Sequence, residues 1–91
     1  MNYLLCRNRV ADYEEWRAVF DSHAEAHREA GLQMLHRWRA FGDPDNVFFL
    51  FAVTDLDSAQ EFMGTSEAAA AAETSGQQEA EYHFLEAVPG Y

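Results

Sequence analysis

The chain has 91 residues, of which 48% are hydrophobic and 14% aromatic, and its formal net charge at neutral pH is −10. This length suits one domain, so we expect residues 1–91 to form a single fold unit. All six basic residues are arginines that lie before residue 40, whereas residues 41–91 hold ten acidic residues and no Lys or Arg. Such a surface repels phosphate groups, which argues against nucleic acids and anionic membranes as partners.

The location of the protein is expected to be cytoplasmic. The first residues lack the basic start of a signal peptide, and Arg7 and Arg9 interrupt the first apolar run. No apolar run approaches the roughly 18 residues of a membrane span. The single Cys6 has no partner for an intrachain disulfide, and its place in an apolar run indicates a small hydrophobic residue rather than a nucleophile.

The first third of the chain predicts a strand followed by a helix. Residues 2–10 read as a strand whose consecutive apolar residues indicate burial on both faces. Asp12 can cap a helix, with Glu15 completing a capping box, and the helix is expected to reach Ala30. Its apolar residues recur at helical spacing and define one face: Tyr13, Trp16, Val19, Phe20, His23, Ala24 and His27.

The middle of the chain predicts two strands joined by a turn. Residues 32–41 form the first, and Gly42–Asp45 have strong turn chemistry. The seven apolar residues Val47–Val53 are too few for a typical helix and indicate a buried central strand.

The last third predicts a helix and a final strand. Asp57 is the expected N-cap of the helix, with Gln60 completing a capping box. Residues 67–73 are alanine-rich and have intrinsic helix propensity. A loop over 74–79 and a strand over 81–88 follow.

The resulting order is βαββαβ, which predicts an α+β, ferredoxin-like fold with a four-stranded antiparallel sheet. The helices of this fold cover only one sheet face. Because the first and third strands look apolar on both faces, we expect a second copy to cover the other face and form a homodimer.

Several segments resemble a known family. Residues 5–23 are similar to the first strand and helix of dimeric α/β-barrel proteins, which are described as cyclase-like or antibiotic-biosynthesis-monooxygenase-like. Residues 42–47 resemble the hairpin turn of that family, and Phe84–Glu86 its last strand. The chain has Asn8 where the family pattern usually has His, and His27 where it usually has Arg. The resemblance implies a barrel-like dimer. The superfamily of these proteins includes oxygenases, isomerases and haem-degrading enzymes.

His23 is the candidate catalytic residue. It follows Trp16 and Phe20 on the apolar face, and the Asp21-x-His23 pattern matches the resemblance. An imidazole between helix and sheet can act as a general base near neutral pH. The alternative is a histidine that only hydrogen-bonds at the edge of the core.

Two histidines have the spacing of a possible metal-binding pair. His23 and His27 are spaced i, i+4, so both could reach one metal ion, with His36 or Asp55 as a third ligand. The pattern lacks the Glu of a His-Glu-x-x-His motif, because Ala24 follows His23. We therefore predict no metal site.

Four further residues are candidates for substrate binding. His36 and Trp38 share one face of a strand and could line a pocket for a flat organic molecule. Trp38 could equally pack at a subunit interface. Tyr3 and Phe51, on the two strands expected to be buried, complete the set.

Four arginines form a possible anion site. Arg7 and Arg9 share one face of the first strand, and Arg37 and Arg39 share one face of the second, at the same end of the sheet. An anionic ligand could dock there. The alternative is pairing with the acidic residues expected nearby, which are Asp12, Glu14, Asp43 and Asp45.

Three functions remain open from the sequence. The first is a small-molecule-binding dimer that acts as a cofactor-free monooxygenase- or cyclase-like enzyme on a small aromatic or polyketide-like substrate. The second is a non-catalytic binding or structural homodimer, and the third is a haem-handling protein. The chain has no Gly-rich phosphate loop, Cys-x-x-Cys or Gly-x-Ser-x-Gly motif, so we expect no cofactor.

Overall fold

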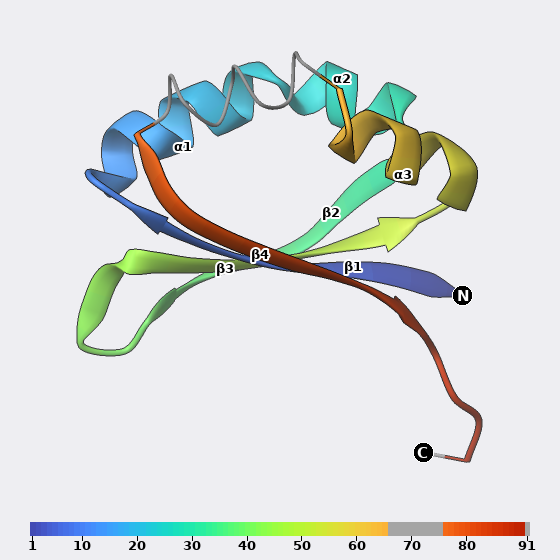
Figure 1. Cartoon of the computed structure of the whole chain (residues 1–91). Coiled ribbons are helices and arrows are strands. Elements are labelled where there is room, and N and C mark those ends of the chain that lie inside the picture. Colours follow the sequence, from blue (N-terminus) through green and yellow to red (C-terminus); the bar gives the residue numbers. More distant parts are fainter. Residues whose placement is uncertain (66–75, 91) are drawn as a thin grey trace.

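The computed structural model describes residues 1–65 and 76–90. All described helices lie on one side of a single sheet, and the other side is without helices (Figure 1). The predicted ferredoxin-like fold is confirmed. The elements in chain order are β1 (Asn2–Val10), α1 (Tyr13–Ser22), α2 (Ala24–Glu29), β2 (Leu32–Ala40), β3 (Asp43–Val53), α3 (Leu56–Met63) and β4 (Gln77–Glu86).

The sheet has the strand order β2-β3-β1-β4, and every neighbouring pair is antiparallel. β3 therefore lies between β1 and β2, as a right-handed split βαβ topology requires. β2 and β4 are the two edges. β2 carries an irregularity at Leu35, because Met34 pairs with Phe51 whereas His36 pairs with the next residue, Leu50.

The core lies between the sheet and the helices. Strand residues alternate between the two faces, so every second residue of β1 and β3 points at the helix layer. Trp16 of α1 is 2% exposed and stacks on Phe20, with ring centroids 4.7 Å apart. Its indole nitrogen lies 3.2 Å from the side chain of the buried Asn8, which can accept its N–H. Burial raises the pKa of Cys6 to about 12, in keeping with its role as a small hydrophobic residue.

The predicted first helix is interrupted at His23. The backbone N–H of His23 donates to the Phe20 carbonyl, three residues back, and α2 starts at Ala24. One residue earlier, the Ser22 hydroxyl donates to the Val19 carbonyl at 2.6 Å. A serine bonded back to the preceding turn bends helices, which accounts for the break.

Two predicted boundaries and one cap were misplaced. Asp55, not Asp57, caps α3 and accepts from the Ser58 amide at 3.1 Å. The hairpin turn is Phe41 and Gly42, and Asp43 already belongs to β3. Gly42 has φ +84°, which glycine adopts at no steric cost.

The last strand also differs from the prediction. β4 begins at Gln77 and ends at Glu86, because it pairs with β1 along nearly the whole length of that strand. The predicted helical segment 67–73 and residues 74–75 of the predicted loop lie outside the described residues. The rest of that loop prediction is wrong from residue 77 on, because residues 77–79 belong to β4.

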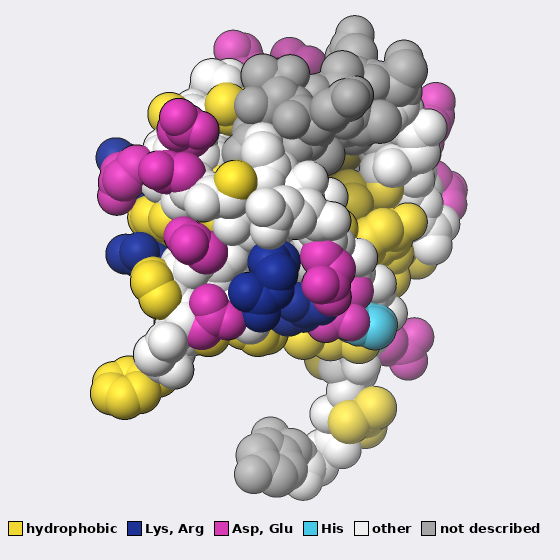
Figure 2. Space-filling model, turned by 60° about the vertical axis from the view of Figure 1, so that its left-hand side comes forward, with side chains coloured by type: hydrophobic (Ala, Val, Ile, Leu, Met, Phe, Trp, Pro, Cys, Tyr) yellow, Lys and Arg dark blue, Asp and Glu magenta, His cyan; other side chains and the backbone are white. Residues whose placement is uncertain are grey.

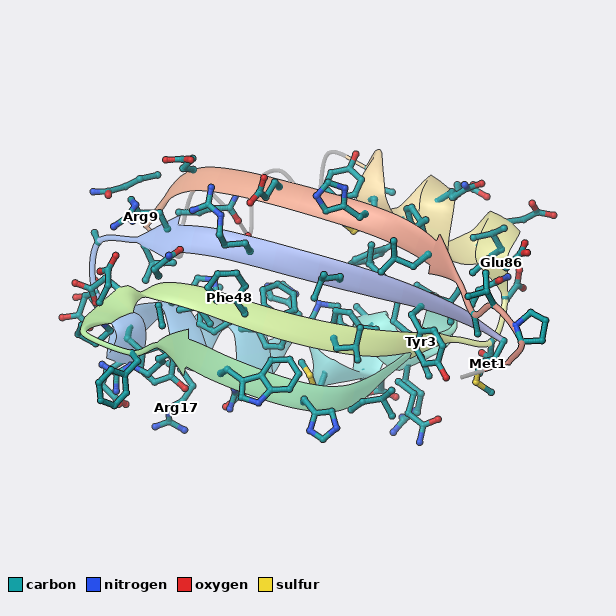
Figure 3. The ribbon with its side chains drawn as sticks, turned by 90° about the horizontal axis from the view of Figure 1, so that it is seen from below. Met1, Tyr3, Arg9, Arg17, Phe48 and Glu86 are labelled. Carbon is teal, nitrogen blue, oxygen red and sulfur yellow. The ribbon has the colours of Figure 1, made fainter. Side chains whose placement is uncertain are left out.

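The helix-free side of the sheet, here called the open face, has an apolar centre and a charged end (Figure 3). Tyr3, Phe48 and Leu50 on this face are partly buried, whereas the exposed fractions of Trp38 and Leu85 reach 48% and 43%. Its residues follow from the strand register: Gln33, His36 and Trp38 on β2; Phe48, Leu50 and Ala52 on β3; Tyr3, Leu5, Arg7 and Arg9 on β1; Glu79, Glu81, His83 and Leu85 on β4.

Candidate functional site

A cavity of about 270 Å³ lies between the helices and the edge strand β2. Its aromatic wall is formed by Phe20 of α1, His27 of α2 and Phe51 of β3. Ala24, Leu32, Met34 and Leu35 add aliphatic surface, and Met34 and Leu35 are exposed. The cavity is thus open to solvent along β2. This volume lies just below the roughly 300–1,000 Å³ of typical small-molecule pockets, so the cavity suits a small ligand of one or two rings.

His27 is packed among aromatic rings. Its ring centroid lies 4.8 Å from that of Phe20, 5.4 Å from that of Phe51 and 5.7 Å from that of Phe62. Burial, assisted by the nearby His23, lowers the pKa of His27 from 6.5 to about 4. His27 is therefore neutral at physiological pH, with one ring nitrogen free to accept a hydrogen bond.

This packing makes stability depend on pH. An unfolded chain binds a proton at His27 below pH 6.5, whereas the folded protein binds it only near pH 4. The folded state should therefore lose stability as pH falls from about 6.5 to 4, by about 1–2 kcal/mol after allowance for solvent screening of a half-buried ring. Urea titrations at pH 7 and pH 4.5 measure this difference. In His27→Phe the difference should shrink, and an unchanged difference would mean that His27 does not cause it.

The cavity also has a polar side, formed by Asp21, His36 and Arg37. Arg37 Nη1 donates to Asp21 Oδ1 at 2.6 Å, which ties the end of α1 to β2. Arg17 Nη1 lies 3.6 Å from the other oxygen of Asp21. A carboxylate in the last turn of a helix is unfavourable to the helix dipole, and these two guanidinium groups offset that effect.

Among the predicted site residues, His36 and Phe51 line the cavity. Phe51 is 3% exposed and contributes a ring to the aromatic wall. His36 lies beside Trp38, with ring centroids 5.0 Å apart and an interplanar angle of 17°. Trp38 and Tyr3 belong to the open face and are not among the cavity residues.

His23, the predicted catalytic residue, lies half-buried at the junction of α1 and α2. It is not among the residues that line the cavity, although it is close enough to His27 to lower the pKa of that residue. His27, one turn later, does line the cavity. The signal was present, because both histidines lie on the same apolar face of the predicted helix.

Sequence reasoning also missed the pairing of Asp21 with Arg37. The Asp21-x-His23 pattern points to the histidine, and the position of Arg37 beside Arg39 on one strand face indicates an anion site instead. An acid at the end of a helix, followed by a strand with arginines on the helix-facing side, is the pattern that could have indicated the pair.

The four strand arginines lie on both faces of the sheet. On the open face, Arg7 contacts Glu79 and Glu81, each at 2.6 Å, and Arg9 contacts Asp43 at 2.9 Å. On the helix side, Arg37 binds Asp21, and the guanidinium carbon of Arg39 lies 4.2 Å from the centroid of the Tyr13 ring. Figure 2 shows arginine side chains surrounded by acidic ones. Among the described residues, the ion-pair interpretation therefore describes Arg7, Arg9 and Arg37, with Asp43 the one partner among those predicted, whereas Arg39 contacts Tyr13 and donates to the Pro44 carbonyl.

Within residues 1–65 and 76–90, no group of three or more His, Cys, Asp or Glu side chains is arranged to hold a metal ion. In the same part of the chain, no helix is both long enough and apolar enough to cross a membrane.

Comparisons with known proteins agree with the fold. No protein-family model matches the chain, and no curated protein sequence does. Solved structures do match. A proposed antibiotic biosynthesis monooxygenase from Caulobacter crescentus CB15 has a TM-score of 0.74 at 19% identity, covering 96% of this chain and 89% of that one. A similarly described protein from Bordetella bronchiseptica has a TM-score of 0.74 at 13% identity, covering 96% of each chain.

A third similar structure is an uncharacterized NIPSNAP domain protein from Burkholderia xenovorans, with a TM-score of 0.69 at 13% identity, covering 98% of this chain and 95% of that one. The chain therefore has the ferredoxin-like fold of antibiotic-biosynthesis-monooxygenase-like structures. At these identities the likeness establishes the fold.

Proposed function

We propose that this protein binds a small aromatic or polyketide-like molecule in the cavity between its helices and β2. The observation that supports this most directly is the aromatic wall of a space of about 270 Å³. Phe20, His27 and Phe51 offer ring faces and edges to a flat ligand, and aromatic pairs of this kind add stabilisation beyond the buried area. The neutral imidazole of His27 supplies a polar contact inside an otherwise apolar wall.

The proposed reaction class is that of a cofactor-free monooxygenase. Solved structures with the same fold are named antibiotic biosynthesis monooxygenases. In such a reaction one atom of dioxygen enters the substrate as a new carbonyl and the other leaves as water. The substrate supplies all four electrons and both hydrogens, so that a CH₂ group and O₂ yield C=O and H₂O. The substrate must therefore be electron-rich, as hydroxylated aromatic and polyketide-like molecules are.

The proposed assembly is a homodimer that joins two open faces. Leu5, Phe48 and Leu50 give this face an apolar centre, with Tyr3 nearer the end that holds Met1, and no helix of the described residues covers it (Figure 3). A second copy presents the same surface, and two-fold symmetry makes it self-complementary.

Oxygen consumption and ligand binding with hydroxylated aromatic compounds, such as 1-naphthol and a naphthalenediol, test the function. We expect NMR signals of residues around His27 to shift on binding. His27→Ala should weaken binding at least tenfold. His23 lies outside the cavity lining, so His23→Ala distinguishes its two predicted roles. Loss of a general base lowers turnover by ~10²–10⁴, whereas loss of a half-buried structural histidine costs about 1 kcal/mol of stability.

The outcomes separate the alternatives. Binding without oxygen uptake would favour a non-catalytic binding protein, and a Soret band in the purified protein would favour haem handling. A His23→Ala variant whose only defect is lower thermal stability would leave His23 with a structural role. Failure of all such probes to bind would contradict the proposal.

A further inference from the structure

The Asp21–Arg37 pair gives the cavity a polar side with no net charge. Arg37 and Arg17 face Asp21, and Arg17 also contacts Glu14 at 3.0 Å. Two guanidinium groups thus share two carboxylates. The entire chain carries a net charge of −10, so its overall electrostatic field disfavours the binding of an anionic ligand.

Asp21 and Arg37 also have hydrogen-bonding groups that their mutual contact does not occupy. The Arg37 side chain is 25% exposed, and among the described residues its one hydrogen bond goes from Nη1 to Asp21. A guanidinium group has five N–H donors, so donors remain beside the cavity. Asp21 is half-exposed, and a carboxylate has about four acceptor sites, of which these arginines occupy only part. Donors and acceptors therefore lie side by side in the lining.

We propose that Asp21 and Arg37 determine ligand specificity, and that the ligand is a net-neutral aromatic molecule whose polar end carries a hydrogen-bond donor next to an acceptor. The donor meets the Asp21 carboxylate and the acceptor meets Arg37. This inference rests on the proposed function, because it assigns the ligand class of the same cavity.

The choice of a neutral ligand follows from charge. A carboxylate ligand would compete with Asp21 for Arg37, and a cationic ligand would compete with Arg37 for Asp21. Either would bring a like charge close to the pair, a carboxylate beside Asp21 or a cation beside Arg37 and Arg17, and would weaken the existing ion pairs. A neutral amide or hydroxy-carbonyl group adds contacts on both sides and removes none. Sites built to hydrogen-bond a substrate discriminate strongly against analogues without the matching groups.

A matched series of one-ring probes tests this in NMR titrations of the unmodified protein. Benzamide is neutral with donor and acceptor, benzoate is anionic, benzylammonium is cationic, and toluene is neutral without polar groups. We expect benzamide to bind at least tenfold more tightly than each of the other three. In the Asp21→Ala, Arg37→Met double variant, which removes both the acceptor and the donor groups, the advantage of benzamide over toluene should fall to less than threefold.

Arg28→Gln is the control variant. Arg28 pairs with Glu25 at 3.4 Å on the exposed side of α2 and does not line the cavity. This variant should leave the order of affinities unchanged. Thermal melts of all variants show whether any loss reflects unfolding.

The outcomes distinguish this inference from the proposed function. Tightest binding of benzoate or of benzylammonium would overturn the neutral-ligand inference while supporting the cavity. Equal binding of all four probes, or an advantage of benzamide that survives the double variant, would show that the pair does not select the ligand. If no probe perturbs the residues around His27, the proposed function itself fails.

Discussion

Phe51→Asp is expected to unfold the protein. Phe51 is 3% exposed and faces the helices from β3, the strand between β1 and β2. Its ring centroid lies within 6.1 Å of those of Phe20, Phe49 and His27. Losing a buried phenylalanine ring costs about 3–5 kcal/mol, and burying an unpaired carboxylate costs several kcal/mol more. The sum is comparable to the total stability of a small domain, which is about 5–15 kcal/mol. Circular dichroism and a thermal melt measure the effect.

Phe51→Leu is the matched control for this variant. It keeps an apolar side chain at the same position and should retain a cooperative melt, at a cost of about 1–3 kcal/mol. A Phe51→Asp protein that melts within a few degrees of the unmodified protein would contradict the central position of Phe51. Because Phe51 also lines the cavity, Phe51→Leu should weaken the binding of aromatic probes.

The topology followed from the sequence because each element had a local signal. Val47–Val53 are seven consecutive apolar residues, which indicated a strand buried on both sides. The structure shows why no polar residue interrupts them. Phe49 and Phe51 face the helices, whereas Phe48 and Leu50 belong to the open face. A continuous apolar run does not predict which of its residues face the helices, because that depends on the register with β1.

The helix boundaries were less predictable from the sequence, both at the start of α3 and at the break between α1 and α2. Asp55 and Asp57 both precede a helical pattern, and both have a polar residue three positions later. The structure selects Asp55, whose carboxylate binds both the amide and the hydroxyl of Ser58. Likewise, the apolar spacing from Trp16 to His27 continues through His23, so periodicity alone gave one helix where there are two.

The candidate site was predicted only in part, because it depends on contacts between distant segments. His36 lines the cavity although it pairs with Leu50 of the open face, and the irregularity at Leu35 lies between these two environments. An insertion of this kind in an edge strand re-aims neighbouring side chains. The pairing of Asp21 with Arg37 likewise joins α1 to β2, and the sequence pattern of an acid at a helix end before a strand with arginines does not distinguish Arg37 from Arg39 as its partner.

Leu50→Asp is expected to abolish the proposed dimer while leaving the chain folded. Leu50 adjoins Phe51 in sequence but belongs to the opposite face, where it pairs with Leu5 of β1 and His36 of β2. It is half-buried in the isolated chain, so the substitution should cost the fold about 1 kcal/mol. In a dimer of two open faces, each copy would bring one carboxylate into an apolar interface. The dissociation constant should rise at least 100-fold, which is about 2.7 kcal/mol. Sedimentation velocity at micromolar concentration measures the change from dimer to monomer.

Leu56→Asp separates an interface effect from a general effect of added charge. Leu56 begins α3 on the helix side of the sheet and is 37% exposed, so it offers an apolar surface position away from the open face. An acidic residue in the first turn of a helix is also favourable to the helix dipole. This variant should remain dimeric.

Two sedimentation results would contradict the proposed dimer. A Leu50→Asp protein that sediments as a dimer would show that the open faces do not meet. An unmodified protein that sediments as a monomer would show that the apolar centre of this face is not covered by a second copy. If Leu50→Asp instead unfolds the chain, Phe48→Asn on the same face introduces a polar group without a charge and gives the same comparison.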